Sequence, residues 1–299
     1  MKNLRKKKGD LYAKMFKISN DLSSRYSVIK ACIRFVNPGR ILWFLSILQN
    51  IPLIKACFYN WPIFILDCFK LTKPGSIIYY ARNGMKYKVR ARTIDVGVLY
   101  EVLVSKCYLK SFSPIHKGDI VIDIGAHIGS FSLFISSFSK DIQIYAIEPQ
   151  KDNFQLLCDN IDLNKSTNIT PLNTAILSTS KAVTFYENKD NLGGHTFFPH
   201  HKEGFAKVEL KITTLKNIFN KYKINKVRLL KMDCEGSEYD ILLNCPDYML
   251  EHIKEIVLEY HYLNNKKNKK TLLTFLKSKG FAKISTSEFP TSILYCKRK

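Results

Sequence analysis

The sequence predicts an α/β protein with a mostly parallel sheet, preceded by a helical extension at the N-terminus. Apolar, β-branched segments alternate with amphipathic segments from about residue 118 to the C-terminus. Such alternation requires crossover connections, which make neighbouring strands parallel. A carboxylate also stands at the end of four apolar segments, at Asp123, Glu148, Asp233 and Glu259. Ligands of open parallel sheets bind at the carboxyl ends of the strands, so the four acids predict one shared site.

Residues 1–75 are expected to form the extension and residues 76–299 the α/β domain. The first 40 or so residues are basic, and two apolar stretches of 14 residues follow at 41–54 and 56–69. Neither reaches the roughly 20 residues that a membrane-spanning helix needs. We expect two helices that pack on the catalytic domain. The alternative is a peripheral membrane contact, which the basic flanks would favour at an anionic surface.

Residues 76–90 have the pattern of a β-hairpin, with Asn83-Gly84 as its turn. A short helix is expected at 95–108. The later elements are expected in this order: strand 119–124, a helix from 130, strand 142–148, helix 153–164, strands 169–176, 183–186 and 208–212, helix 215–222, strand 227–232, helix 239–243, strand 256–259, helix 271–279 closed by Gly280, and strands 282–286 and 292–297.

The turn after the first strand of the α/β domain indicates a nucleoside cofactor. Its glycines, Gly125 and Gly129, form a Gly-x-x-x-Gly loop, whereas a dinucleotide site usually has Gly-x-Gly-x-x-Gly. Asp123, two residues before the loop, would repel a pyrophosphate and suits a cationic ligand such as S-adenosylmethionine. Glu148 ends the next strand, where a carboxylate accepts hydrogen bonds from both ribose hydroxyls. An ordinary glycine turn explains the glycines alone but not these two acids.

The charge balance favours anionic partners. The formal net charge is +22 and the isoelectric point is about 9.6. An acidic membrane face or an anionic glycan fits this balance, and a solvated lysine-rich surface explains it equally well. No aromatic and basic RNA-binding motif is present, so nucleic acid is not an expected partner.

Cysteine usage is typical of a reducing compartment. The eight cysteines form no Cys-x-x-Cys pair, and several stand in apolar segments. Buried thiols fit this pattern better than disulfides or a zinc site. No apolar core follows the basic N-terminus closely enough for a secretory signal, so a cytoplasmic location is expected, with peripheral membrane contact as a variant.

A second motif, Lys231-Met-Asp-Cys-Glu-Gly-Ser-Glu238, follows another apolar strand. Together with the glycine loop and Glu148-Pro149, it resembles the FkbM family of methyltransferases. The segments 160–164 and 258–261 extend the resemblance, which covers roughly residues 95–262. The resemblance implies a seven-stranded Rossmann-like sheet with a C-terminal antiparallel strand. It also implies S-adenosylmethionine as methyl donor and O-methylation, often of sugar or natural-product hydroxyls.

The resemblance also assigns roles by position. His127 stands where a small polar residue, often asparagine, is expected, and its ring can still donate a hydrogen bond. Glu101 would cap the cofactor, although a surface helix explains it equally well. The cofactor-binding residues implied are Asp123, Gly125, Ala126, His127 and Gly129 for the amino-acid part, Glu148 with Pro149 for the ribose, Asn173 to Ala175 for the adenine, and Glu101. Asp233 and Glu235 would lie beside the methyl group and the acceptor.

The chemistry requires alignment more than activation, because a sulfonium is already a good methyl donor. A sugar hydroxyl is a poor nucleophile and gains from a base as its proton leaves. Asp233, Glu235 and His261 are the candidates. His261 should titrate nearest neutrality and would be an apt base. The alternative is that His261 is a structural polar residue at a strand end, hydrogen-bonded to the backbone. Lys231 is expected to neutralise one of the acids, unless it is solvated.

No metal site is expected. His195, His200 and His201 are the only clustered histidines, the adjacent pair cannot point one way on a strand, and no acid stands at ligand spacing. A mobile loop over the acceptor is expected at 193–196.

Three functions remain open from the sequence. The first is O-methylation of a small molecule, sugar, glycan or lipid-linked glycan. The second is a nucleotide-using enzyme of another class, either a nicotinamide oxidoreductase or a sugar-nucleotide transferase. The third is a membrane-associated binding module that keeps the fold without the activity.

Overall fold

The computed structural model describes residues 38–298, apart from 109–112, 181–184, 189–204 and 287–291. The chain divides into two compact units, Met1–Pro52 and Leu53–Lys299. The two apolar stretches form three helices: α3 (Pro38–Gln49), α4 (Ile51–Cys57) and α5 (Trp61–Cys68). Proline follows the first residue of both α4 and α5, where its missing N–H has no intrahelical partner to lose. Within the described ranges, no helix is long and apolar enough to cross a bilayer.

A buried acid joins α5 to the hairpin that follows it. Asp67 is 1% exposed and accepts hydrogen bonds from the hydroxyls of Tyr79 and Thr72 and from the backbone N–H of Arg92. The ring of Phe64 packs edge-on against Tyr79, 5.1 Å between centroids. The predicted packing of the second apolar stretch on the α/β domain is therefore confirmed for α5. The predicted domain boundary at residue 75 remains a prediction.

The hairpin consists of β1 (Ser76–Tyr80) and β2 (Lys86–Arg90), paired antiparallel as expected around Gly84. The predicted helix at 95–108 has two parts, α6 (Asp95–Leu99) and a single π-helical turn, η1 (Tyr100–Val104). Two asparagines bond the hairpin to α8 (Lys151–Leu163): Asn160 lies in this helix, and Asn164 is its C-cap. Each side chain accepts from a backbone N–H of β2 and donates to a backbone carbonyl of the same strand.

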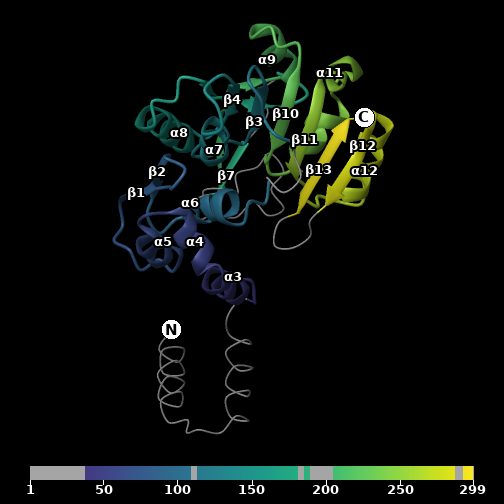
Figure 1. Ribbon diagram of the computed structural model, residues 1–299. Helices are drawn as coiled ribbons and strands as arrows, with labels where there is room; N and C mark the ends of the chain where they lie inside the picture. Colours follow the sequence, from purple (N-terminus) through teal and green to yellow (C-terminus); the bar gives the residue numbers. More distant parts are fainter. Residues whose placement is uncertain (1–37, 109–112, 181–184, 189–204, 287–291, 299) are drawn as a thin grey trace. The chain divides into compact units, whose positions relative to one another are not determined.

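A seven-stranded sheet forms the centre of the second unit, in the order β12-β13-β11-β10-β3-β4-β5 (Figure 1). The five strands from β11 to β5 are parallel, and β13 runs antiparallel to both of its neighbours. This confirms the predicted Rossmann-like α/β class. The strands are β3 (Ile120–Ile124), β4 (Gln143–Ile147), β5 (Ile169–Leu172), β10 (Val227–Met232), β11 (Ile253–Glu259), β12 (Phe281–Thr286) and β13 (Ile293–Arg298).

Apolar side chains cover both faces of the sheet, because parallel strands are buried on both sides. All six residues of β10 are buried. On one face, alternate residues such as Ile122 and Ile124 belong to a core with four helices: α9 (Leu215–Lys221), α10 (Glu238–Leu243), α11 (Asp247–Glu251) and α12 (Lys269–Ser278). Helix α7 (Ser130–Ser136) contacts η1, β4 and β5.

Two predicted strands are interrupted. The segment 169–176 forms β5 and then β6 (Ala175–Ile176), which pairs with β9 (Ile212–Thr213) in a separate two-stranded sheet. Asn173 causes the break, since its side-chain amide donates to the carbonyls of Glu148 and Pro149 and turns the chain away. The segment 208–212 likewise divides between β9 and β8 (Phe205–Val208), which pairs with β7 (Phe185–Asn188). The predicted loop at 193–196 lies outside the described residues.

Candidate active site

The glycine loop connects β3 to α7 through three residues in the left-handed region. The φ angles of Gly125, His127 and Gly129 are 76°, 51° and 85°. The backbone N–H groups of Gly125 and Ala126 both donate to the carbonyl of Ile147 at the end of β4. A Cβ on Gly125 would lie 1.7 Å from the carbonyl oxygen of Asp233. Only glycine fits between the ends of β4 and β10, which explains the first glycine of the motif.

A buried lysine ties the loop to both acid-bearing strands. Lys231 Nζ donates to the carbonyl of Gly125 at 2.8 Å and lies 3.1 Å from Asp123 Oδ1 and 4.0 Å from Asp233 Oδ2. Burial opposes its charge, but Asp123 and Asp233 raise the pKa of Lys231 above its usual value. Asp123 also accepts from the Ser132 hydroxyl and is 0% exposed. Lys231 was expected to neutralise Asp233 or Glu235, and the structure pairs it more closely with Asp123 than with Asp233.

Glu148 lies at the end of β4 beside the loop. Its two carboxylate oxygens accept from the backbone N–H groups of His127 at 2.9 Å and Gln150 at 3.0 Å. Burial raises the pKa of Glu148 to about 7, although these hydrogen bonds oppose the shift. The side-chain amide of Asn173 donates to the backbone carbonyls of Glu148 and Pro149, so the three residues lie close together, and their assignment to the nucleoside remains a prediction. Ala175, which the resemblance assigned to the adenine, lies in β6 and is only 3% exposed, and this assignment remains a prediction.

His127 is a neutral, buried residue. Its side chain lies 3.7 Å from Asp95 Oδ1, but Asp95 is already bonded to the Arg90 guanidinium at 2.7 Å. Burial lowers the pKa of His127 to about 4, so the contact with Asp95 is not an ion pair at neutral pH. Neither ring nitrogen has a hydrogen-bond partner in the part of the chain that the structure describes. One donor and one acceptor therefore remain for a ligand at the loop.

Four carboxylates gather opposite the loop, and we call them the acid cluster: Glu101, Asp233, Glu235 and Glu259. The Tyr108 hydroxyl lies 2.9 Å from Asp233 Oδ2 and 3.3 Å from Glu259 Oε2, within hydrogen-bond distance of both. Burial and the charge of Asp233 raise the pKa of Glu101 to about 7. Glu101 therefore lies close enough to Asp233 for their charges to interact, and its role as a cap of the cofactor remains a prediction.

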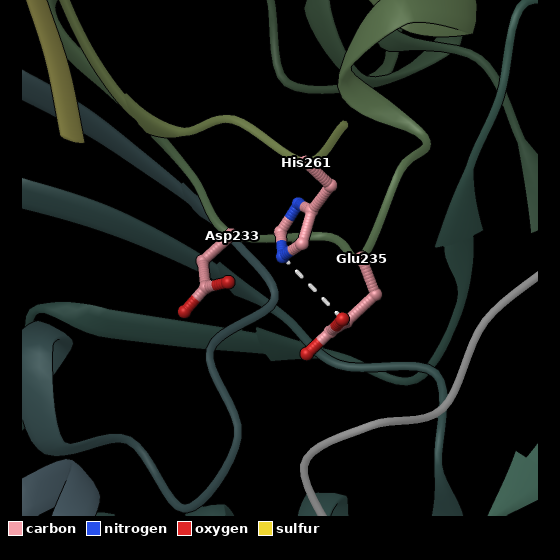
Figure 2. A group of neighbouring side chains, drawn as sticks. All are labelled: Asp233, Glu235 and His261. Atoms are coloured by element: carbon pink, nitrogen blue, oxygen red, sulfur yellow. Dashed lines mark ion pairs between the residues drawn. The ribbon is translucent and has the colours of Figure 1, made fainter. Parts of the chain in front are cut away.

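His261 lies just beyond β11, between two carboxylates. Nε2 is 3.4 Å from Glu235 Oε2, and Nδ1 is 3.2 Å from Oε1 of Glu238, which is 0% exposed (Figure 2). Burial would lower the pKa of His261, but Glu238 and then Glu235 raise it to about 10. The expectation that His261 titrates near neutrality is therefore wrong, because these neighbours hold it as an imidazolium.

Burial raises the pKa of two further cluster acids. The pKa of Glu235 rises to about 8 and that of Glu259 to about 7, with Asp233 contributing to both and His261 opposing both. Carboxyls that titrate near neutrality accept a proton from a reacting group more readily than ordinary carboxylates do. The cluster therefore offers an electronegative surface and proton acceptors at one place.

Sequence reasoning did not find Tyr108 or the role of Glu238. Tyr108 is 125 residues from Asp233 in the chain and belongs to no motif. Glu238 is part of the second motif, but an acid in the first turn of a helix, as Glu238 is in α10, is ordinary and gave no signal. The structure shows that it accepts from the backbone N–H of Gly236 and of His261, besides its contact with the imidazole.

These features together define a methyltransferase of the Rossmann-like class that uses S-adenosylmethionine. The glycine loop, Glu148 at the end of β4 and the ring nitrogens of His127, which have no hydrogen-bond partner among the described residues, fit that cofactor. The family model of the methyltransferase FkbM domain matches residues 123–283, more than half of the chain. The chain belongs to this family, as the sequence motifs indicated.

Characterised relatives are distant. Methyltransferase 1 of Beauveria bassiana is 26% identical over 217 residues, which cover 66% of this chain and 85% of that protein. The 31-O-demethyl-FK506 methyltransferase FkbM of Streptomyces tacrolimicus is 22% identical and covers 63% of this chain and 82% of its own length. A crystal structure of methyltransferase FkbM from Methylobacillus flagellatus is 15% identical with a TM-score of 0.43; the match covers 85% of this chain and 60% of that one.

Proposed function

We propose that this methyltransferase acts on a hydroxyl oxygen of a sugar, a glycan or a lipid-linked glycan. The observation that carries the proposal is the position of the acid cluster. Asp233 touches the cofactor loop through its own backbone carbonyl, and the Glu235, Glu259 and Glu101 carboxyls lie around it. Proton acceptors beside a methyl donor suit an alcohol, which must lose its proton as the new bond forms.

The protein's own groups divide into a cofactor side and an acceptor side. Glu148 would accept from the ribose hydroxyls, and His127 would hydrogen-bond to the amino-acid part. When bound, S-adenosylmethionine supplies an electrophilic methyl group on a sulfonium. Asp233 and Glu235 would hold the acceptor hydroxyl in line with that methyl, and a cluster carboxylate would take the proton. Most of the contribution comes from alignment.

The acidity of the cluster also favours a second acceptor class. A protonated amine would be attracted by the same carboxylates, and they would remove its extra proton before transfer. N-methylation is therefore the alternative that the geometry supports, and the chemical position of the new methyl group distinguishes the two.

The test is methyl transfer from labelled S-adenosylmethionine by the full-length protein to a panel of neutral sugars, anionic sugars and amines. We expect a product whose methyl group correlates with an ether carbon in NMR. Asp233→Asn should lower the rate at least tenfold and still bind S-adenosylhomocysteine. Asp247→Asn, at the exposed start of α11, is the matched control and should be unchanged. A product methylated on nitrogen would replace the proposal with the amine alternative.

A further inference from the structure

The acid cluster and His261 bring three metal-ligating side chains to one point. One ligand atom each from Asp233, Glu235 and His261 lies within 4.8 Å of the other two. The Asp233 and Glu235 carboxylates come from the end of β10, and the imidazole comes from the end of the adjacent strand β11. Figure 2 shows the three side chains facing a common space, with Nε2 of His261 directed at the two carboxylates.

The expectation of no metal site was argued only from His195, His200 and His201, which lie outside the described residues. The sequence grouped His261 with Asp233 and Glu235 only as a candidate base, and two helices and a strand separate it from Glu235 along the chain. The parallel pairing of β10 with β11 is what joins them.

The orientation of His261 is the second observation that points to a cation. Glu238 Oε1 lies 3.2 Å from Nδ1 and also accepts from the backbone N–H of His261 at 2.8 Å. A metal-bound histidine nearly always donates its other ring N–H to a carboxylate or carbonyl, which fixes the ring and raises its basicity. Glu238 is 0% exposed, so it serves only neighbours within the protein. Its contact leaves Nε2 as the nitrogen that faces the carboxylates.

The surrounding charges also favour a cation. Lys231 lies 4.0 Å from Asp233, but it is paired more closely with Asp123, at 3.1 Å. Glu101 and Glu259 both interact electrostatically with Asp233. The exposed fractions of the Asp233 and Glu235 side chains are 30% and 35%, so an ion has a route from solvent.

We propose that Asp233, Glu235 and His261 bind one divalent cation, of the class that accepts both carboxylate and imidazole ligands, such as Mn²⁺. Binding replaces the proton on Nε2 by the cation. Three protein ligands leave coordination positions open, and an acceptor oxygen could occupy one of them. That last use rests on the proposed function, whereas cation binding does not require it.

The experiment uses tag-free, full-length protein treated with a chelator and then titrated with Mn²⁺, followed by electron paramagnetic resonance. We expect one bound ion per chain and nitrogen modulation from a coordinated imidazole in pulsed spectra. His261→Ala and Asp233→Asn should weaken binding at least tenfold, and Glu238→Gln about 10- to 100-fold through loss of the orienting contact. His252→Ala, at the exposed end of α11, is the matched control and should bind like wild type.

Two readouts keep the result decisive. The nitrogen signal comes from the wild-type protein, so a variant that fails to fold does not remove the test. Wild-type protein that binds S-adenosylhomocysteine but neither Mn²⁺ nor Zn²⁺ would overturn the cation site and leave the methyltransferase intact. Binding that His261→Ala does not change would also overturn it. Wild-type protein that does not bind S-adenosylhomocysteine would instead count against the proposed function.

Discussion

Substitution of three glycines by alanine should separate backbone strain from close contact. Gly118, Gly125 and Gly129 have nearly equal φ angles of 81°, 76° and 85°. Alanine in this left-handed region costs roughly 1–2 kcal/mol at each position. The surroundings differ: a Cβ at Gly118 meets nothing within 4 Å, one at Gly129 lies 2.5 Å from a side-chain atom of Leu157, and one at Gly125 lies 1.7 Å from the Asp233 carbonyl oxygen.

The three different surroundings predict three different losses in the free energy of unfolding. Gly118→Ala should lower the free energy of unfolding by about 1 kcal/mol. Gly129→Ala adds the repacking of one flexible side chain, about 1–3 kcal/mol more. At Gly125 the obstacle is backbone, which must move by more than about 1 Å before the Cβ reaches 3.0 Å. That shift breaks the Asp233 N–H bond to Ile124 and the Lys231 bond to the loop, so we expect a loss of roughly 4 kcal/mol or more.

Urea unfolding followed by circular dichroism measures all three variants. The order expected is Gly118→Ala, then Gly129→Ala, then Gly125→Ala as the most destabilised, and Gly125→Ala should also lose binding of S-adenosylhomocysteine. Equal destabilisation of Gly125→Ala and Gly118→Ala would show that the loop and the end of β10 do not touch, and would refute the reasoning.

Three further predictions address other parts of the molecule. Asn160→Leu should lower the free energy of unfolding by about 3 kcal/mol in the same urea assay. The buried Asn160 amide makes two hydrogen bonds to the backbone of Lys88 and one to the carbonyl of Ile128, and the substitution removes all three. A loss under about 1 kcal/mol would contradict this prediction. If the Glu148 carboxylate binds the ribose, the affinity for S-adenosylhomocysteine should rise about tenfold from pH 6 to pH 8, because a carboxyl with a pKa of about 7 ionises in this range. Calorimetry measures this affinity, and the Glu148→Gln variant should show no such rise. We also propose that the exposed side chains of Leu66 and Ile63 on α5 contact an anionic membrane surface. Wild-type protein should then float with acidic vesicles, and Leu66→Ser should float less. Wild-type protein that does not float would exclude this contact.

Much of the sheet could be predicted because local sequence determines it. Apolar β-branched runs such as 120–124 and 227–232 have no stable place except between two layers of helices. Their terminal acids then fall at the carboxyl edge by geometry alone. Of the four strand-end acids, Asp123 and Asp233 both lie within 4.0 Å of Lys231, and Asp233 and Glu259 both lie within hydrogen-bond distance of Tyr108. Glu148 lies beside the glycine loop.

The errors have a common physical cause, because each depended on a contact between distant segments. One strand was expected at 169–176, but Asn173 bonds to carbonyls about 25 residues away and ends β5. The titration of His261 was inferred from its free value, whereas Glu238 on α10 decides it. Tyr108 reaches the acid cluster only because the sheet brings the end of η1 near β10 and β11.

The distribution of charge supports the proposed assignment of donor and acceptor to different sides of one site. Lys231 is nearer to Asp123 than to Asp233, so it balances the acid on the cofactor side more fully. The acid cluster, which the proposed function places on the acceptor side, has four carboxylates, with His261 beside Glu235 and Lys231 4.0 Å from Asp233. A sulfonium whose methyl group faced the cluster would be stabilised there, and this attraction would be lost once the methyl had left and the sulfur was neutral. A Cβ on Gly125 would overlap the Asp233 carbonyl, so the loop and the end of β10 are closely packed. Such packing would favour the fixed separation that an in-line transfer requires.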